Sequence, residues 1–204
     1  MKAKSKIIGL MEQQRTNKAM KILILANRAS GLYLFRKELL AQLIANNYLI
    51  YFSVPQKSDD LYVEKLIKLG AKHIYTKIDR RGINPFKDYC VVRNYKKTIK
   101  NIKPNIILTY TVKPNIYGNY AANKFKIPVI MNITGIGTSL ISHKLKFLIK
   151  ILYKYACSKS NTVFFQNLSN KGFFLENSLV NQEKTKLIPG SGVNLEKFKP
   201  LGKT

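Results

Sequence analysis

The chain has 204 residues, 46% of them hydrophobic, which suits one globular domain with a sizeable core and argues against intrinsic disorder. A formal charge of +26, from 36 Lys and Arg against 10 Asp and Glu, points to an anionic partner: nucleic acid, anionic membrane or phosphorylated lipid. The cysteines, Cys90 and Cys157, lack metal-ligand spacing, so they indicate neither a disulfide framework nor a zinc site.

The first segment, residues 1–19, differs from the rest of the chain. It is polar and basic, and its one apolar patch, Ile7–Met11, is too short for the core of a signal peptide or for a membrane span. Met20 directly precedes the first strand-like run. We therefore expect residues 1–19 to be a disordered leader or a spurious N-terminal extension.

From Met20 onward, short runs rich in β-branched residues alternate with longer amphipathic segments. The predicted strands are Lys21–Asn27, Tyr48–Val54, His73–Ile78, Asn105–Thr111, Val129–Ile133, Thr162–Gln166 and Lys186–Ile188. The predicted helices are Leu32–Ala45, Asp60–Leu69, Asp88–Ile102, Tyr117–Phe125, Ser142–Cys157 and Ser169–Asn177. Apolar runs without strict alternation are typical of strands buried on both faces. The pattern predicts a single α/β domain, over residues 20–190, with a doubly wound, Rossmann-like parallel sheet of about seven strands.

In such sheets ligands bind beyond the carboxyl ends of the strands, so the loops there are the candidate sites. The first loop, Asn27–Gly31, leads into a helix whose N-terminus favours anions. Ser30 and Gly31 are therefore candidates for contact with the diphosphate of a sugar nucleotide. The alternative is an ordinary turn capped by serine. No G-x-G-x-x-G pattern occurs, which weakens an interpretation as a NAD enzyme.

The third loop, Asp79–Pro85, carries the adjacent arginines Arg80 and Arg81. An arginine can bind a phosphate through two hydrogen bonds, so Arg80 is a candidate substrate contact. The alternative is a pair of exposed, solvated arginines.

The loop after the fourth strand, Thr109–Gly118, contains Lys113 and Asn115. A lysine can neutralise a phosphate and an asparagine can bind a sugar hydroxyl, so both are candidate acceptor contacts. The alternative is that Pro114 and Asn115 only start the next helix.

The loop after the fifth strand, Asn132–Thr138, places two glycines among hydroxyl residues. Glycine lets the backbone approach a ligand closely, so four residues are candidate substrate contacts. They are Thr134, Gly135, Gly137 and Thr138. The alternative is a plain flexible turn.

A long segment of the chain carries basic residues without any acidic ones. Between Asp88 and Glu176 the sequence has no acidic residue, whereas fourteen Lys and Arg residues fall there. Within this segment, Lys146, Lys150 and Lys154 follow one another at intervals of four residues. This spacing predicts a basic stripe on an interfacial helix that lies on an anionic membrane. Each lysine would cost about 2.5–3.5 kcal/mol at bilayer depth, which argues against a span. The alternative is a core-packing helix with a solvated lysine face.

Several catalytic patterns are missing from the sequence. There is no D-x-D triplet for a metal-bound nucleotide sugar, and the adjacent pair Asp59 and Asp60 is explained by helix capping. His73 and His143 are isolated, so neither a metal site nor a Ser-His-Asp triad is expected.

Six segments together resemble the N-terminal domain of retaining family 4 glycosyltransferases of the GT-B fold. They are Lys21–Gly31, Arg80–Pro85, Thr109–Gly118, Asn132–Thr138, Phe165–Asn167 and Ile188–Pro200. The chain is most similar to the subgroup that extends undecaprenyl-diphosphate-linked glycans for capsule, O-antigen and glycoprotein assembly. One departure is Val112, which stands where many members have a cleft-lining histidine, so that role cannot be transferred.

The resemblance implies the acceptor-binding half of a glycosyltransferase, with a UDP-sugar as donor substrate, no metal or other cofactor, and a polyprenyl-diphosphate-linked glycan as acceptor. It further implies a cytoplasmic, peripheral place on the inner face of the plasma membrane. Residues 191–204 would begin the linker to a C-terminal donor domain, which is missing here and would be supplied in cis or in trans. We therefore expect the chain to be inactive alone.

Two other functions stay open. The chain could be the acceptor-binding or membrane-anchoring subunit of a two-chain glycosyltransferase. The charge of +26 also motivates a nucleic-acid-binding module, but the sequence has no RNP-like, helix-turn-helix or KH signature, so no nucleic acid is expected as a partner.

Overall fold

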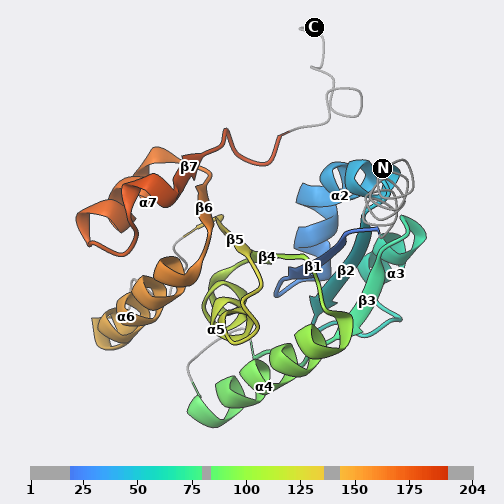
Figure 1. Cartoon of the computed structure of the whole chain (residues 1–204), viewed down its shortest axis with the longest axis horizontal. Coiled ribbons are helices and arrows are strands. Elements are labelled where there is room, and N and C mark those ends of the chain that lie inside the picture. Colours follow the sequence, from blue (N-terminus) through green and yellow to red (C-terminus); the bar gives the residue numbers. More distant parts are fainter. Residues whose placement is uncertain (1–18, 80–83, 136–142, 193–204) are drawn as a thin grey trace, which may run out of the picture.

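The computed structural model describes residues 19–79, 84–135 and 143–192, with only the backbone described for residues 143–146. The predicted leader and the predicted linker lie almost entirely outside these ranges, so those domain boundaries remain predictions. Within the described ranges, strands and helices alternate along the chain (Figure 1).

Seven strands within the described residues form one parallel sheet, in the order β3-β2-β1-β4-β5-β6-β7. The strands are β1 (Lys21–Leu25), β2 (Leu49–Val54), β3 (Lys72–Tyr75), β4 (Ile106–Tyr110), β5 (Val129–Ile133), β6 (Thr162–Phe165) and β7 (Thr185–Leu187). This order is the doubly wound arrangement that the alternating pattern predicted. The predicted fold class is confirmed.

The helices connect successive strands. They are α2 (Ala29–Ala45), α3 (Leu61–Lys68), α4 (Pro85–Ile102), α5 (Asn119–Asn123), α6 (His143–Lys159) and α7 (Leu168–Glu176). A π-helical turn, η1 (Pro114–Gly118), leads directly into α5, and a 3₁₀ turn, η3 (Gln182–Lys184), precedes β7. Asp60, Asn84 and Asn167 start α3, α4 and α7 by accepting hydrogen bonds from first-turn N–H groups.

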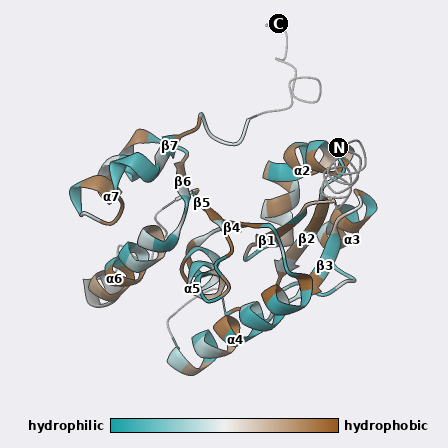
Figure 2. Cartoon of the chain, in the orientation of Figure 1, coloured by the Kyte–Doolittle hydropathy of each residue, from teal (hydrophilic) through white to brown (hydrophobic). Residues whose placement is uncertain are grey.

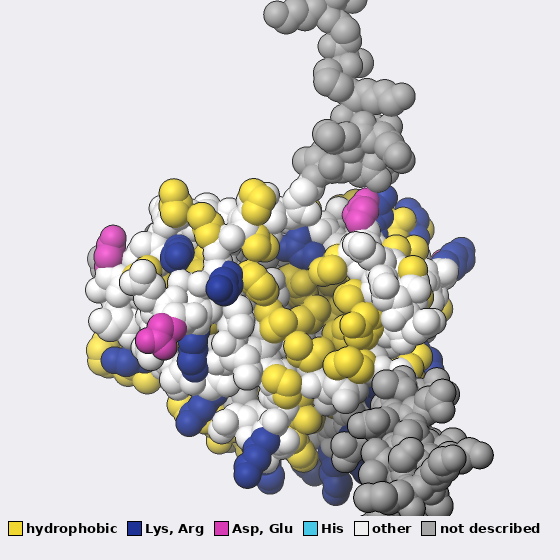
Figure 3. Space-filling model, turned by 45° about the horizontal axis from the view of Figure 1, so that its top comes forward, with side chains coloured by type: hydrophobic (Ala, Val, Ile, Leu, Met, Phe, Trp, Pro, Cys, Tyr) yellow, Lys and Arg dark blue, Asp and Glu magenta, His cyan; other side chains and the backbone are white. Residues whose placement is uncertain are grey.

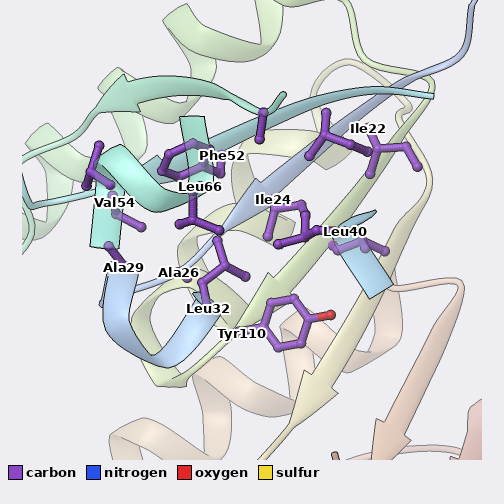
Figure 4. Close-up of a cluster of buried hydrophobic side chains, with 14 residues drawn as sticks. Ile22, Ile24, Ala26, Ala29, Leu32, Leu40, Phe52, Val54, Leu66 and Tyr110 are labelled. Carbon is purple, nitrogen blue, oxygen red and sulfur yellow. The ribbon is translucent and has the colours of Figure 1, made fainter. Parts of the chain in front are cut away.

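Helices cover the sheet in two layers. Ile22 and Ile24 of β1 pack with α2 and α3 in one hydrophobic cluster (Figure 4). Their neighbours Leu23 and Leu25 point the other way, into a cluster with α4 and α5. A third cluster joins β5 and β6 to α6 and α7. Because both faces of the inner strands are covered, these strands are mostly hydrophobic along their length (Figure 2).

Four helices are followed by non-glycine residues in the left-handed region of backbone conformation. These residues are Asn47, Lys103, Lys126 and Ser178, which follow α2, α4, α5 and α7, with φ between 52 and 63°. A glycine, Gly70, occupies the equivalent position after α3. Each of these non-glycine residues adopts a backbone conformation that favours glycine.

Hydrophobic side chains also gather on the surface. In Figure 3 they occupy the middle of the visible face, between the side that carries α7 and the side that carries α2, with Lys and Arg side chains around them. Exposed apolar residues on α2 include Phe35 and Leu39.

Candidate functional site

The strand order reverses between β1 and β4, and ligands of doubly wound sheets bind beyond the carboxyl ends of the strands at such a point. Two loops therefore define the candidate site: the turn from β1 to α2 and the turn from β4 to η1. The loop after β5 lies beside them, since β5 pairs with β4.

The turn from β1 to α2 leaves the N-terminus of α2 open to an anion. Arg28 occupies the N-cap position in an extended conformation and makes no capping hydrogen bond through its side chain. Instead, Gln56, just past β2, accepts a hydrogen bond from the backbone N–H of Ala29 at 3.0 Å. Ser30 and Gly31, predicted as diphosphate contacts, lie half-buried in the first turn of α2. Further first-turn N–H groups of a helix lack partners within it, so they can bind an anion.

Arg36, further along α2, places a positive charge near the end of β4. Its guanidinium lies 5.0 Å from the centre of the Tyr110 ring, at the end of β4, and the residue is 9% exposed. Burial raises the pKa of Tyr110, and the neighbouring Arg36 charge partly offsets this. The sequence analysis missed Arg36 because nothing local distinguishes it from a surface arginine.

The turn from β4 to η1 has an unusual backbone. Thr111 has a φ of 72°, which is rare for a β-branched residue and is often found at functional sites. Its hydroxyl donates to the carbonyl of Tyr110. Gly118, at the end of η1, lies so close to the sheet that an added Cβ would come within 2.7 Å of a Leu25 methyl carbon. Only glycine allows η1 to pack at this depth.

Lys113 and Asp88 form a buried ion pair below this turn. The Lys113 ammonium lies 2.7 Å from one Asp88 oxygen, and both side chains are less than 10% exposed. The other oxygen of Asp88 accepts from the backbone N–H of Asn84 at 3.3 Å. Burial raises the pKa of Tyr117, and the nearby negative charge of the Asp88 carboxylate raises it further. This network links the start of α4 to the loop after β4.

Three buried asparagines form a second network beside the ion pair. Asn115 donates to the carbonyl of Asn132 at 3.0 Å, and Asn119 donates to the carbonyl of Asn115 at 2.7 Å. The side-chain oxygens of Asn115 and Asn119 are buried without a hydrogen-bond partner among the described residues. Tyr153 of α6 approaches the Asn115 side chain, but without the geometry of a hydrogen bond. Buried acceptors without partners are rare, so they mark places where water or a ligand group fits.

The loop after β5 is described only in its first part. Thr134 and Gly135 are exposed, and a Cβ at Gly135 would meet none of the described atoms within 4 Å. The predicted contacts Arg80, Gly137 and Thr138 lie outside the described residues, so the structure does not test them.

The predicted membrane stripe lies on α6. Lys154 is exposed, whereas Lys150 turns toward α7, where it donates to the side chain of Asn177 and lies 5.5 Å from the centre of the Phe173 ring. The side chain of Lys146 lies outside the described residues. None of the helices in the described part of the chain has the length and apolar character needed to cross a bilayer.

Metal ligands do not cluster in the described residues. No group of three or more His, Cys, Asp or Glu side chains there is arranged to hold an ion. Asp88 is held instead by Lys113 and Asn84.

Comparison with known proteins identifies the family. Residues 21–167 match the family model described as "Glycosyl transferase 4-like". The chain belongs to this glycosyltransferase family. The resemblance that the six sequence segments suggested is therefore confirmed.

A curated relative matches most of this chain. It is the Campylobacter jejuni N,N'-diacetylbacillosaminyl-diphospho-undecaprenol alpha-1,3-N-acetylgalactosaminyltransferase, 31% identical over 191 residues. The match covers 89% of this chain and 49% of the relative. The chain thus spans about half the length of the curated relative it matches.

Solved structures of glycosyltransferases share the fold. A Rickettsia africae glycosyltransferase matches with a TM-score of 0.66 at 19% identity, over 92% of this chain and 47% of that one. Anabaena HepE, solved with UDP and glucose, matches with a TM-score of 0.62 at 15% identity, over 90% of this chain and 47% of that one. In both cases this chain corresponds to about half of the solved chain.

Proposed function

We propose that this chain is the acceptor-binding half of a glycosyltransferase that transfers a sugar from a UDP-sugar to a polyprenyl-diphosphate-linked glycan. The observation that carries the proposal is the 31% identity, over 89% of the chain, to a relative named for N-acetylgalactosaminyl transfer to a diphospho-undecaprenol-linked sugar. A UDP-linked donor agrees with the UDP and glucose found in Anabaena HepE, a protein of the same fold.

The carboxyl edge of the sheet supplies chemistry that suits this substrate. The uncapped N-terminus of α2, at Ser30 and Gly31, can receive an oxygen of the donor diphosphate. Thr134 and Gly135 lie exposed beyond β5, where a hydroxyl and an open backbone can contact the acceptor. Arg80, Gly137 and Thr138 stay in the proposal as further acceptor contacts in the neighbouring loops.

Lys113 and Asn115 lie buried beneath this surface and support the site. The Lys113 ammonium is engaged by Asp88, so its main contribution is to hold the loop after β4 in position. The unpartnered oxygen of Asn115 is available to a hydroxyl group that enters the site, directly or through a water.

We also propose where the chain acts and that catalysis needs a second half. The chain acts peripherally at the cytoplasmic face of the plasma membrane, because its acceptor is anchored there, and Lys146, Lys150 and Lys154 of α6 lie near the membrane. The stabilisation of the transferring sugar comes from a second, donor-binding half, in cis or in trans. The chain alone therefore binds acceptor but does not turn over donor.

Acceptor binding by the purified chain tests this proposal directly. Calorimetry with a water-soluble, short-chain polyprenyl diphosphate carrying one amino sugar should show binding that free amino sugar does not compete away. Gly135→Leu, which adds bulk where the structure has open space, should weaken binding at least tenfold. Gly172→Leu on α7 adds the same bulk away from the edge and should leave binding unchanged. Absence of acceptor binding, or equal effects of the two variants, would refute the proposal.

A further inference from the structure

Two cations, Arg36 and Lys113, are buried in the part of the chain that the structure describes. Lys113 has the Asp88 carboxylate as its counter-charge. None of the described ion pairs includes Arg36, although this residue is only 9% exposed. A buried charge without a counter-charge destabilises a fold, so we expect Arg36 to have a role beyond packing.

Arg36 stands at a position of α2 that would suit an apolar residue. It lies between Leu32 and Leu40 on the buried stripe of the helix. Both leucines belong, with Tyr110, to the apolar cluster between α2 and the sheet (Figure 4). An apolar side chain at position 36 would complete this stripe without the cost of burying a charge.

The described contacts of the guanidinium do not compensate its charge. It donates to the carbonyl of Phe35 at 2.7 Å and lies 5.0 Å from the centre of the Tyr110 ring. Neither partner carries a negative charge at pH 7, and a guanidinium has five N–H donors. Glu38, the nearest carboxylate in the sequence, lies 3.5 Å from the Lys37 ammonium, and residues two apart on a helix do not face each other.

The position of Arg36 suits a phosphate group. Tyr110 ends β4, beside β1, where the strand order reverses. Ser30, in the open first turn of α2, precedes Arg36 by six residues, which is about 9 Å along the helix axis. A diphosphate with one phosphate group at this first turn therefore brings the other toward the guanidinium. Arginine binds phosphate through two parallel hydrogen bonds, and stacking on an aromatic ring orients it.

We propose that Arg36 binds a phosphate group at the candidate site and that Tyr110 positions its guanidinium. The ligand class is a diphosphate, a group that the UDP-linked donor and the lipid-linked acceptor share. This inference rests on the proposed function for these two sources, and it adds the residue that recognises the phosphate. On binding, the guanidinium exchanges the neutral carbonyl of Phe35 for a charged oxygen, which compensates its buried charge.

Arg36→Met tests the phosphate contact, because methionine keeps an unbranched apolar side chain and removes the charge. The parent chain should bind inorganic pyrophosphate in calorimetry, and Arg36→Met should bind it about ten- to a hundredfold more weakly, as expected for a lost hydrogen bond between charged groups. Arg93→Met is the matched control, since Arg93 is exposed on α4 in the opposite layer. It should bind like the parent. Equal losses in the two variants, or parent-like binding by Arg36→Met, would overturn the proposal.

Folding stability separates a binding role from a structural one. Because the charge of Arg36 is uncompensated, the urea midpoint of Arg36→Met without ligand should equal or exceed that of the parent. Pyrophosphate should raise the midpoint of the parent but not that of Arg36→Met. Arg36→Lys keeps the charge without the planar fork and should retain part of the affinity. A lowered midpoint for Arg36→Met, together with no affinity retained by Arg36→Lys, would assign Arg36 to the fold and overturn the proposal.

Tyr110 is tested as a positioning residue. Tyr110→Leu removes the aromatic ring and should weaken pyrophosphate binding by a smaller factor than Arg36→Met. Tyr110→Phe keeps the ring and should restore the affinity of the parent. Equal losses in both Tyr110 variants would contradict positioning by the ring.

Two larger ligands distinguish the source of the phosphate. UDP represents the donor, and the soluble prenyl diphosphate that carries an amino sugar represents the acceptor. The ligand whose affinity falls in Arg36→Met is the source, and a loss for neither would overturn the proposal. Failure of the proposed function is seen separately, because the parent would then bind pyrophosphate through Arg36 but bind the sugar-bearing acceptor no more tightly than pyrophosphate.

Discussion

The buried ion pair between Lys113 and Asp88 gives a direct test of how the carboxyl edge is held together. Lys113→Met keeps most of the aliphatic side chain but removes the ammonium group. The Asp88 carboxylate then stays buried, with the backbone N–H of Asn84 as its remaining described hydrogen-bond partner. Removing one member of a buried pair typically costs about 3–5 kcal/mol, because the other charge is left uncompensated.

Lys113→Met should therefore lower the free energy of unfolding by about 3–5 kcal/mol. Asp88→Asn leaves the buried ammonium without its counter-charge and should cost a similar amount. The double variant Lys113→Met, Asp88→Asn should recover most of the loss.

Urea unfolding followed by circular dichroism measures these effects. With a slope of about 2 kcal/mol per molar urea, a loss of about 4 kcal/mol moves the midpoint by about 2 M. Lys87→Met is the matched control. Its partner Asp79 lies at 3.0 Å, but the two side chains are 61% and 42% exposed, and such pairs contribute at most about 1 kcal/mol. Equal, small losses for Lys113→Met and Lys87→Met would refute the reasoning.

Three further predictions concern other buried groups. Gly118→Ala should lower stability to urea by about 1–2 kcal/mol, because the added methyl group meets the fully buried Leu25 and overpacking outweighs the gain in helix propensity; an unchanged midpoint would contradict this. Burial lowers the pKa of His73 below 6.5, so stability should fall as the pH drops through 6.5, where the unfolded chain takes up a proton and the folded chain does not. His73→Gln should flatten that fall in urea titrations between pH 7 and 5.5. Burial raises the pKa of Cys157 to about 12, so a thiol reagent should label only Cys90 in the folded protein, and two labels without denaturant would refute the burial.

Much of the fold could be predicted from the sequence, because strand identity depends on local runs of apolar residues. The strand Val129–Ile133 was predicted with the bounds that the structure has. Helix starts were less accurate. Ala29, Ser30 and Gly31 belong to α2 although the predicted helix began at Leu32, since a serine and a glycine are tolerated in a first turn.

The helix predicted for Tyr117–Phe125 shows the limit of local reasoning. The chain turns helical already at Pro114, first as η1 and then as the short α5. Pro114 suits a first helical position, but the π-helical turn depends on the close approach of Gly118 to β1 and β4. That approach joins residues far apart in the sequence, so the pattern around Gly118 could not indicate it.

The candidate site was predictable in place but not in detail. The carboxyl edge follows from the parallel, doubly wound sheet, which the alternating pattern already predicted. The pairing of Lys113 with Asp88 joins the loop after β4 to the start of α4, and neither residue alone indicates its partner. Arg36 and Asn119 were missed for the same reason, because their burial comes from packing between elements.

Substitution of the residues that have a left-handed backbone conformation after the helices should make this protein more heat-resistant. Lys103, Lys126 and Ser178 hold side chains in a conformation that costs about 1–2 kcal/mol for residues other than glycine and, more mildly, asparagine. Replacing them with glycine would relieve strain without touching the proposed binding surfaces, and would give a sturdier background on which weakening substitutions can be studied.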